Sequence, residues 1–313
     1  MRVSTEVLVS KSLVFRAMLT NGVMIESLAF KSNNYLEIPL PDDNAKIFLV
    51  VMNILHENTG AVPDQVDFTQ LVEIATLVDK YSWQEAVRGQ AQRWIESLRS
   101  SVPVSSTDEL LPWIWISWVF HFSDLFRKLT AVAQKEATGP IDMHNPYGVP
   151  VPEVVKTRIG RQRVEAISQI QSLLVSQMED LKETAMREQD LFGDTFEMVH
   201  AFRLGFLTLS GFKWGILSPR ESDSHHFEGV SFRDLSTHIR TMVDIDDWIV
   251  GTKPPGTHLP FVLDGMSAMV PLLGRILGSP GSFAYGTSNI KKRFVELITD
   301  LEQGEWGLDL KDF

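Results

Sequence analysis

Residues 2 to 19 read RVSTEVLVSKSLVFRAML, and this stretch decides how the first hundred residues are interpreted. Its second part predicts a helix over 13–19, because Phe15, Met18 and Leu19 fall on one apolar stripe at helical spacing. The turn-forming pair NG follows at once. A lysine interrupts the apolar residues before this helix, and the stretch lacks the long apolar run and cleavage site of a signal peptide.

The segments that follow combine a strand pattern with helical patterns. Residues 35–40 read YLEIPL, whose alternation predicts a short strand. We expect Asp42 to cap the next helix through its side-chain oxygen, and not to act as a catalytic acid. Asp67 is expected to begin a further helix in the same way. Ser82 and Glu85 then have the spacing of a capping box at a third helix.

The order and spacing of these elements resemble a BTB/POZ domain. The resemblance is carried by RVSTEVLVSKSLVFRAML, MIES, LEIPLPDDNAKIFLVVMNILHEN and VDFTQLVEIATLVDKYSWQEAVRGQAQRWIESL, and it covers residues 2–98. Ser12 and Phe15 match the small polar residue and the buried phenylalanine at the family's second helix. The family's usual first strand, with its aspartate, is missing here. The strings PDD, WIWISWVF and FRLGFLTLSGFKWGILSPR suit the type common in filamentous fungi and extend the resemblance loosely to about 241.

The resemblance implies an α+β fold that is mainly helical: a small sheet with a helical cluster, followed by an all-helical C-terminal region. It also implies protein–protein interaction. The first helices of BTB domains commonly form a dimer surface, which here would include Val7, Leu8 and Met18, with Phe15 more deeply placed in the core.

A further implied partner is a cullin. In BTB domains that act as cullin adaptors, a hydrophobic–x–Glu motif after the second helix helps to dock the cullin, and Met24 and Glu26 match that motif. The alternative is a local loop in which Met24 packs on the domain and Glu26 caps a turn.

The composition divides the chain into two regions. Residues 100–106 read SSVPVSS, a linker between a truncated BTB/POZ-like domain at 1–100 and a helical region at 107–313. Thr107 is expected to cap a tryptophan-rich helix, which is apolar on most sides and is therefore expected in the core. Beyond 243 the pattern is weak. Further helices are expected at 123–139, 153–187, 196–211, 231–242 and 289–301.

The sequence gives little support for chemistry. It has no cysteine, no nucleotide-binding or hydrolase motif, and no zinc-protease motif, so we assign no catalytic, cofactor-binding or metal-binding residues. The pair His225–His226 is expected in an exposed loop. The basic cluster of Lys156, Arg158, Arg161 and Arg163 is expected to be a solvated helix face and not a phosphate-binding patch.

The net charge of −11 disfavours general binding to nucleic acids or to anionic membranes. With no cysteine and no glycosylation sequon, the chain is expected in the cytoplasm or the nucleus. We therefore expect a protein-interaction module or scaffold that is not an enzyme and whose candidate partners include a second copy of the chain, as a homodimer. One alternative is a substrate adaptor for a cullin ubiquitin ligase. An alternative of another class is an enzyme or small-molecule binder with a pocket in 192–313.

Overall fold

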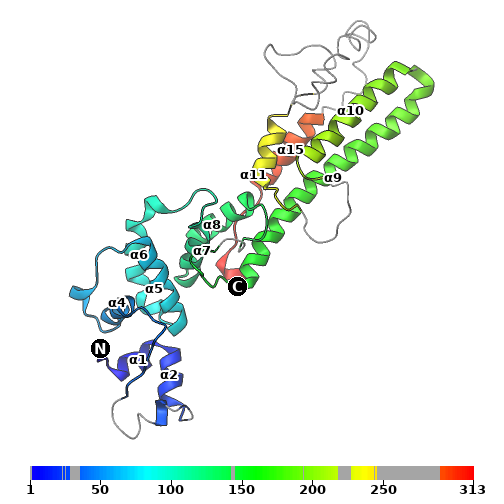
Figure 1. Ribbon diagram of the computed structural model, residues 1–313. Coiled ribbons are helices and arrows are strands. Elements are labelled where there is room, and N and C mark those ends of the chain that lie inside the picture. The colour runs from blue at the N-terminus through cyan, green and yellow to red at the C-terminus, as the bar shows by residue number, and fades with distance from the viewer. Residues whose placement is uncertain are drawn as a thin grey trace. The chain divides into compact units, whose positions relative to one another are not determined.

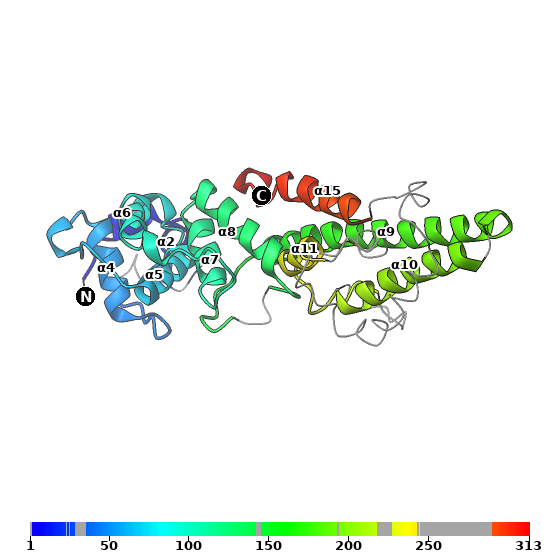
Figure 2. The same cartoon turned by 90° about the horizontal axis from the view of Figure 1, so that it is seen from above.

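The computed structural model describes two compact units of helices (Figures 1 and 2). It describes residues 2–22, 24, 26–28, 36–141, 145–192, 194–217, 227–242, 244 and 290–313. Unit 1 is made of residues 1–133, 141–157 and 307–313, and unit 2 of residues 134–140 and 158–306. The linker and domain boundary expected at 100–106 stay a prediction.

Unit 1 is built from short helices around an aromatic core. They are α1 (Thr5–Lys11), α2 (Leu13–Thr20), α4 (Ala45–Leu55), α5 (Phe68–Tyr81), α6 (Gln84–Ser97), α7 (Leu110–Val119) and most of α8 (Ser123–Glu136), with 3₁₀ turns at Thr59–Ala61, Arg99–Ser101 and Leu310–Asp312. Trp83 lies at the centre of this core. Its ring centroid is 4.7 Å from Tyr81, 5.7 Å from Phe15 and 5.8 Å from Phe48.

The expected α+β fold is wrong for the described part of the chain, which contains helices and connecting segments but no strand. Residues 36–40, within the expected strand, form neither a strand nor a helix. A strand needs a neighbour that accepts and donates its backbone hydrogen bonds. Residues before this segment form helix α1, and no described segment offers that neighbour.

Some expected helix caps are confirmed and others are wrong. Asp67 caps α5 in a capping box, with Gln70 N 2.8 Å from its Oδ1. Asp42 is not a cap: Asn44 caps α4, its Oδ1 accepting from a backbone N–H at 3.0 Å. Ser82 has φ of +56° and ends α5 in the left-handed region, so it does not begin α6. The N-terminus of α6 carries no side-chain cap.

The tryptophan-rich helix is a core helix, as expected. In α7 the side chains of Trp113, Ile114 and Ile116 are fully buried, and Trp113 stacks on Phe68 of α5 with centroids 5.4 Å apart. The helix begins at Leu110, and the expected cap residue Thr107 contributes only its carbonyl oxygen.

Residues 307–313 pack against α7 and α8, which the sequence did not indicate. Arg127 and Asp309 form an ion pair at 2.5 Å, and the backbone N–H of Leu308 donates to Thr130 Oγ1 at 2.8 Å. A Cβ on Gly307 would lie 2.2 Å from the carbonyl oxygen of Arg127, and its φ is +91°. Glycine is therefore required where this segment turns onto α8.

Unit 2 surrounds one hydrophobic core. It contains most of α9 (Glu153–Phe192), α10 (Asp194–Lys213), α11 (Phe232–Arg240) and α15 (Ile290–Gln303), and α9 and α10 lie side by side in both ribbon views (Figures 1 and 2). These four helices match the expected positions. Fully buried core residues include Ile167, Ile170, Leu174, Leu207, Ile239, Phe294 and Ile298.

Candidate interaction surface and basic pocket

The expected dimer residues of the first two helices are only partly accessible. Leu8 is 5% exposed and belongs to the core, so the structure does not leave it free for a partner. Val7 and Met18 are half-buried. Phe15 is 2% exposed and lies in the aromatic core, as expected.

A buried serine joins α2 to the end of α5. The hydroxyl of Ser12 donates to the carbonyl oxygen of Tyr81 at 2.6 Å and accepts from the N–H of Phe15 at 3.0 Å. Lys11 adds a bond from its ammonium to the carbonyl oxygen of Leu55 at 2.9 Å. Because the polar groups at this helix junction are satisfied, the first two helices are held in a defined position on the unit.

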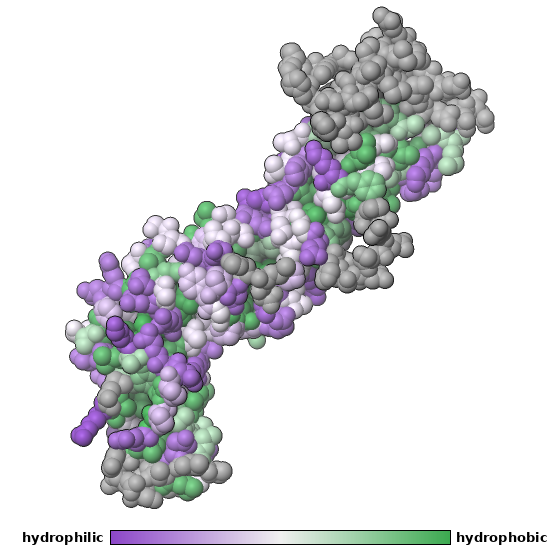
Figure 3. Space-filling model, in the orientation of Figure 1, coloured by the Kyte–Doolittle hydropathy of each residue, from purple (hydrophilic) through white to green (hydrophobic). Residues whose placement is uncertain are grey.

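Four large apolar side chains are exposed within the first 28 residues. They are Leu13 at 66%, Leu28 at 52%, Met24 at 44% and Val3 at 37%, and we call them the N-terminal apolar group. They are four of the thirteen such side chains in the described part of the chain. In the space-filling view, hydrophobic residues are prominent at the lower end, where Figure 1 draws α1 and α2 (Figure 3).

The motif expected to dock a cullin lies in a locally fixed turn. The backbone N–H of Met24 donates to Asn21 Oδ1 at 3.2 Å, and the N–H of Gly22 donates to the hydroxyl of Ser27 at 2.9 Å. Ser27 is fully buried. Met24 is 44% exposed and Glu26 is half-buried, so Met24 is accessible to a partner, and both the docking interpretation and the local-loop alternative stay predictions.

Asp43, Lys80 and Tyr81 form a polar cluster near α5 that stabilises unit 1. Asp43 Oδ2 accepts from the hydroxyl of Tyr81 at 2.5 Å, and Asp43 Oδ1 pairs with Lys80 at 2.7 Å. Burial, together with the bond to Asp43, raises the pKa of Tyr81 to about 12. That pKa is far from neutrality, so Tyr81 is unsuited to general base catalysis at pH 7. The sequence analysis did not identify this cluster, since Asp43 and Lys80 are distant in the sequence.

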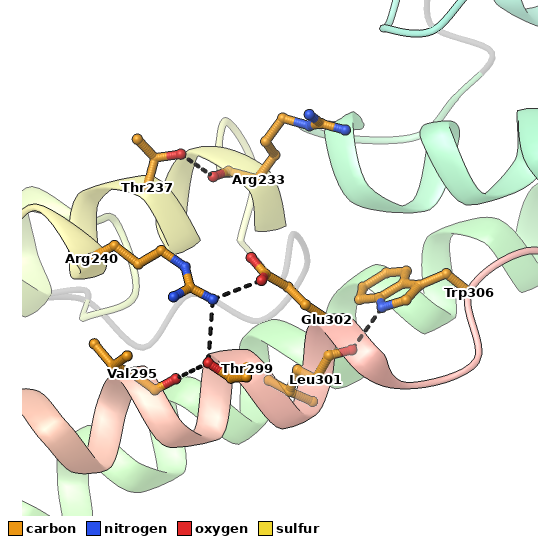
Figure 4. A network of polar contacts seen from close by, with 8 residues as sticks. All are labelled: Arg233, Thr237, Arg240, Val295, Thr299, Leu301, Glu302 and Trp306. Carbon is orange, nitrogen blue, oxygen red and sulfur yellow. Dashed lines mark hydrogen bonds and ion pairs between the residues drawn. The ribbon is translucent and has the colours of Figure 1, made fainter.

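Unit 2 contains a cavity of about 320 Å³, which we call the basic pocket. It is lined by Lys135, Phe232, Arg233, Ser236, Thr237, Arg240 and Glu302. Arg240 Nη2 lies 2.7 Å from Glu302 Oε2 and 3.4 Å from Thr299 Oγ1 (Figure 4). The ammonium of Lys135 lies 5.0 Å from the ring centroid of Trp306. The Trp306 ring is itself fixed by a 2.7 Å bond from its N–H to the carbonyl oxygen of Leu301 (Figure 4).

Sequence reasoning missed the basic pocket, although part of its signal was present. Arg233, Thr237 and Arg240 recur at steps of four and three residues in α11, which places polar side chains on one face of the helix. The other contributors come from residue 135 and from residues 302–306, and no local pattern links them to α11.

The expectation of a solvated basic face is wrong for Arg163. That residue is 4% exposed, and its Nη1 donates to the carbonyl oxygens of Phe227 and Val230 at 3.0 and 2.7 Å. Burial lowers the pKa of Arg163. It therefore holds the segment that leads into α11. Arg161 does form a surface ion pair, with Glu165 at 3.2 Å.

The described residues can be compared with two expectations, the one about a metal site and the one about a membrane span. No group of three acidic or histidine side chains that could hold a metal ion occurs in the described ranges, and His225–His226 lies outside them. Of the helices that the structure describes, none combines the length and the apolar character needed to cross a bilayer. Comparisons with protein-family models, curated proteins and solved structures found no match for this chain.

Proposed function

We propose that this chain is a protein-interaction module that binds its partner through the N-terminal apolar group. The observation that carries the proposal is the exposure of Leu13, Met24 and Leu28 on a segment that also contains the buried residues Ser12, Phe15 and Ser27. Fully burying one leucine side chain contributes roughly 1.5–3 kcal/mol, so two or three such contacts supply a large part of a binding free energy.

The anchoring of the first helices supports the same proposal. Ser12 and Lys11 tie α2 and the end of α1 to the carbonyl oxygens of Tyr81 and Leu55. A surface that is already ordered loses less conformational entropy when a partner binds. We propose that this partner is a second copy of the chain. The resemblance to BTB domains, which often dimerise, favours this choice.

The double variant Leu13→Lys/Leu28→Lys is expected to weaken self-association by at least about tenfold, because lysine ammonium groups resist burial in an apolar contact. Light scattering coupled to size-exclusion chromatography, over a range of concentrations, measures this. Val104→Lys is the matched control, since Val104 is 83% exposed and lies outside the group.

The control is expected to associate like the wild type. Affinity purification with mass spectrometry on the same three proteins extends the test to other partners. A wild type that stays monomeric, and that captures no protein lost by the double variant, contradicts the proposal.

A second candidate function is that of a substrate adaptor for a cullin ubiquitin ligase. The observation in its favour is the exposure of Met24 beside the half-buried Glu26, since a docking methionine must be reachable. The candidate rests on a three-residue resemblance together with this exposure.

A pull-down with the N-terminal region of a cullin separates this candidate from a general scaffold. The wild type is expected to bind, and Met24→Ala/Glu26→Lys is expected to reduce binding at least about tenfold through the loss of an apolar anchor and a reversed charge. Met186→Ala provides the control, because Met186 is 73% exposed on α9. No binding by a folded wild type would rule the adaptor out.

A further inference from the structure

The basic pocket gathers positive charge in a protein that is acidic overall. Three cations line it, Lys135, Arg233 and Arg240. Two carboxylates partly neutralise these cations. One is Glu302 in the lining, and the other is Glu136, whose Oε1 lies 2.8 Å from Arg233 Nε. The chain carries a net charge of −11, so an excess of cations around one cavity is a local feature that the composition does not predict.

Lys135 is the cation without a carboxylate at ion-pair distance among the described residues. Its ammonium lies over the Trp306 ring at 5.0 Å, and no hydrogen bond or ion pair joins it to another described residue. Burial lowers the pKa of Lys135, with the nearby Arg233 acting in the same direction and Glu302 against it. A partly buried ammonium of this kind gains most from an anion that replaces its lost water.

Ser236 supplies an unpaired hydroxyl in the same lining. It is 4% exposed, and its Oγ has no hydrogen-bond partner among the residues that the structure describes. Serine and threonine in helices usually donate to the carbonyl oxygen four residues earlier. Thr237 and Thr241 do so, to Arg233 and Thr237 at 2.9 and 2.8 Å, whereas Ser236 does not. Leaving a buried hydroxyl unsatisfied costs free energy, so its position points to a missing acceptor.

We propose that the basic pocket binds a phosphate group, either as inorganic phosphate or as a small phosphomonoester, through the ammonium of Lys135 and the hydroxyl of Ser236. Arg233 and Arg240 add charge and further N–H donors, since Arg233 pairs with Glu136 through Nε and Arg240 pairs with Glu302 through Nη2. A dianionic phosphate offers several acceptor oxygens and matches this donor set. The cavity of about 320 Å³ has room for phosphate with a small substituent.

The carboxylate of Glu302 repels an incoming anion, so a change at this residue provides a further test. It is held by Arg240 at 2.7 Å. Glu302→Gln removes the negative charge and frees Arg240 for the ligand, so this variant is expected to bind phosphate more tightly than the wild type. A pocket that attracts anions by general surface charge alone would not need Ser236.

The test is isothermal titration of the full chain with inorganic phosphate near neutral pH, with chloride at matched ionic strength as the reference. Lys135→Gln is expected to weaken binding at least about tenfold and Ser236→Ala about three- to tenfold, while Glu302→Gln strengthens it several-fold. Lys292→Gln on α15 is the control, since Lys292 lies outside the pocket and is 67% exposed. It is expected to bind as the wild type does.

A second arm uses O-phosphoserine in place of inorganic phosphate. Binding of both supports a site that accepts esters, and binding of inorganic phosphate alone supports a site for the free ion. Circular dichroism shows whether each variant is folded. No heat of binding from the wild type with either probe overturns the proposal, and so does equal binding by wild type and folded Lys135→Gln.

Discussion

Replacing Trp83 with alanine is expected to lower the free energy of unfolding of unit 1 by about 3–5 kcal/mol. The side chain is fully buried, and its ring is within 6 Å of the rings of Phe15, Phe48 and Tyr81, as measured between centroids. Alanine leaves a cavity between α2, α4 and α5 that these rings cannot fill. Peptides from α2 and α5 are therefore expected to exchange their amide hydrogens much faster, as measured by mass spectrometry.

Trp83→Phe is the matched variant, because the indole N–H of Trp83 is buried without a hydrogen-bond partner. Phenylalanine keeps most of the aromatic contact and removes the unsatisfied donor. We expect it to cost less than half as much as alanine. If both variants accelerate exchange equally, packing around the ring is not what stabilises this core.

The helices of the chain could largely be predicted from the sequence, because their apolar stripes are local. Asp67 also carried a clear cap signal, and it caps α5 in the structure. The caps that failed had a competitor nearby. Asp42 was expected at α4, but Asn44 takes that role, and Asp43 turns instead to Tyr81 and Lys80.

Whether a sheet forms could not be predicted from the local sequence pattern. Alternation over 35–40 states which residues share a face, but a strand forms only where a second strand lies beside it. The first residues, which carry part of the family resemblance, form α1 and provide no such strand. When a local sequence pattern is compatible with two conformations, the segments that pack against it determine which conformation forms.

The two candidate sites differ in how far the sequence could reveal them. Met24 and Glu26 were identified from a motif, and the structure adds their accessibility. The basic pocket joins Lys135 and Glu302, which are far apart in the chain. Their meeting depends on tertiary packing, and so does the unpaired state of Ser236.

Tyr81→Phe is expected to destabilise unit 1 by about 1–3 kcal/mol at neutral pH. The change removes the donor that reaches Asp43 Oδ2 at 2.5 Å and leaves a carboxylate whose side chain is 6% exposed with Lys80 as its remaining partner. Phenylalanine keeps the ring contacts with Phe15 and Trp83, so the cost reports on the hydroxyl. Denaturant unfolding, monitored by the hydrogen exchange of the α5 amides, measures this loss of stability.

The advantage of wild type over Tyr81→Phe is expected to shrink as the pH rises from 10 to 12. The pKa of Tyr81 is raised from 10.0 to about 12, so the folded protein keeps this proton after the unfolded chain has lost it. The unfolded state then binds fewer protons, and stability falls with pH in that window but not below it. The paired ammonium of Lys80, whose pKa is raised chiefly by Asp43, acts in the same direction. Tyr147→Phe is the control, because no hydrogen bond joins the Tyr147 hydroxyl to another residue that the structure describes. A difference between wild type and Tyr81→Phe that stays constant up to pH 12 contradicts a proton held by Asp43.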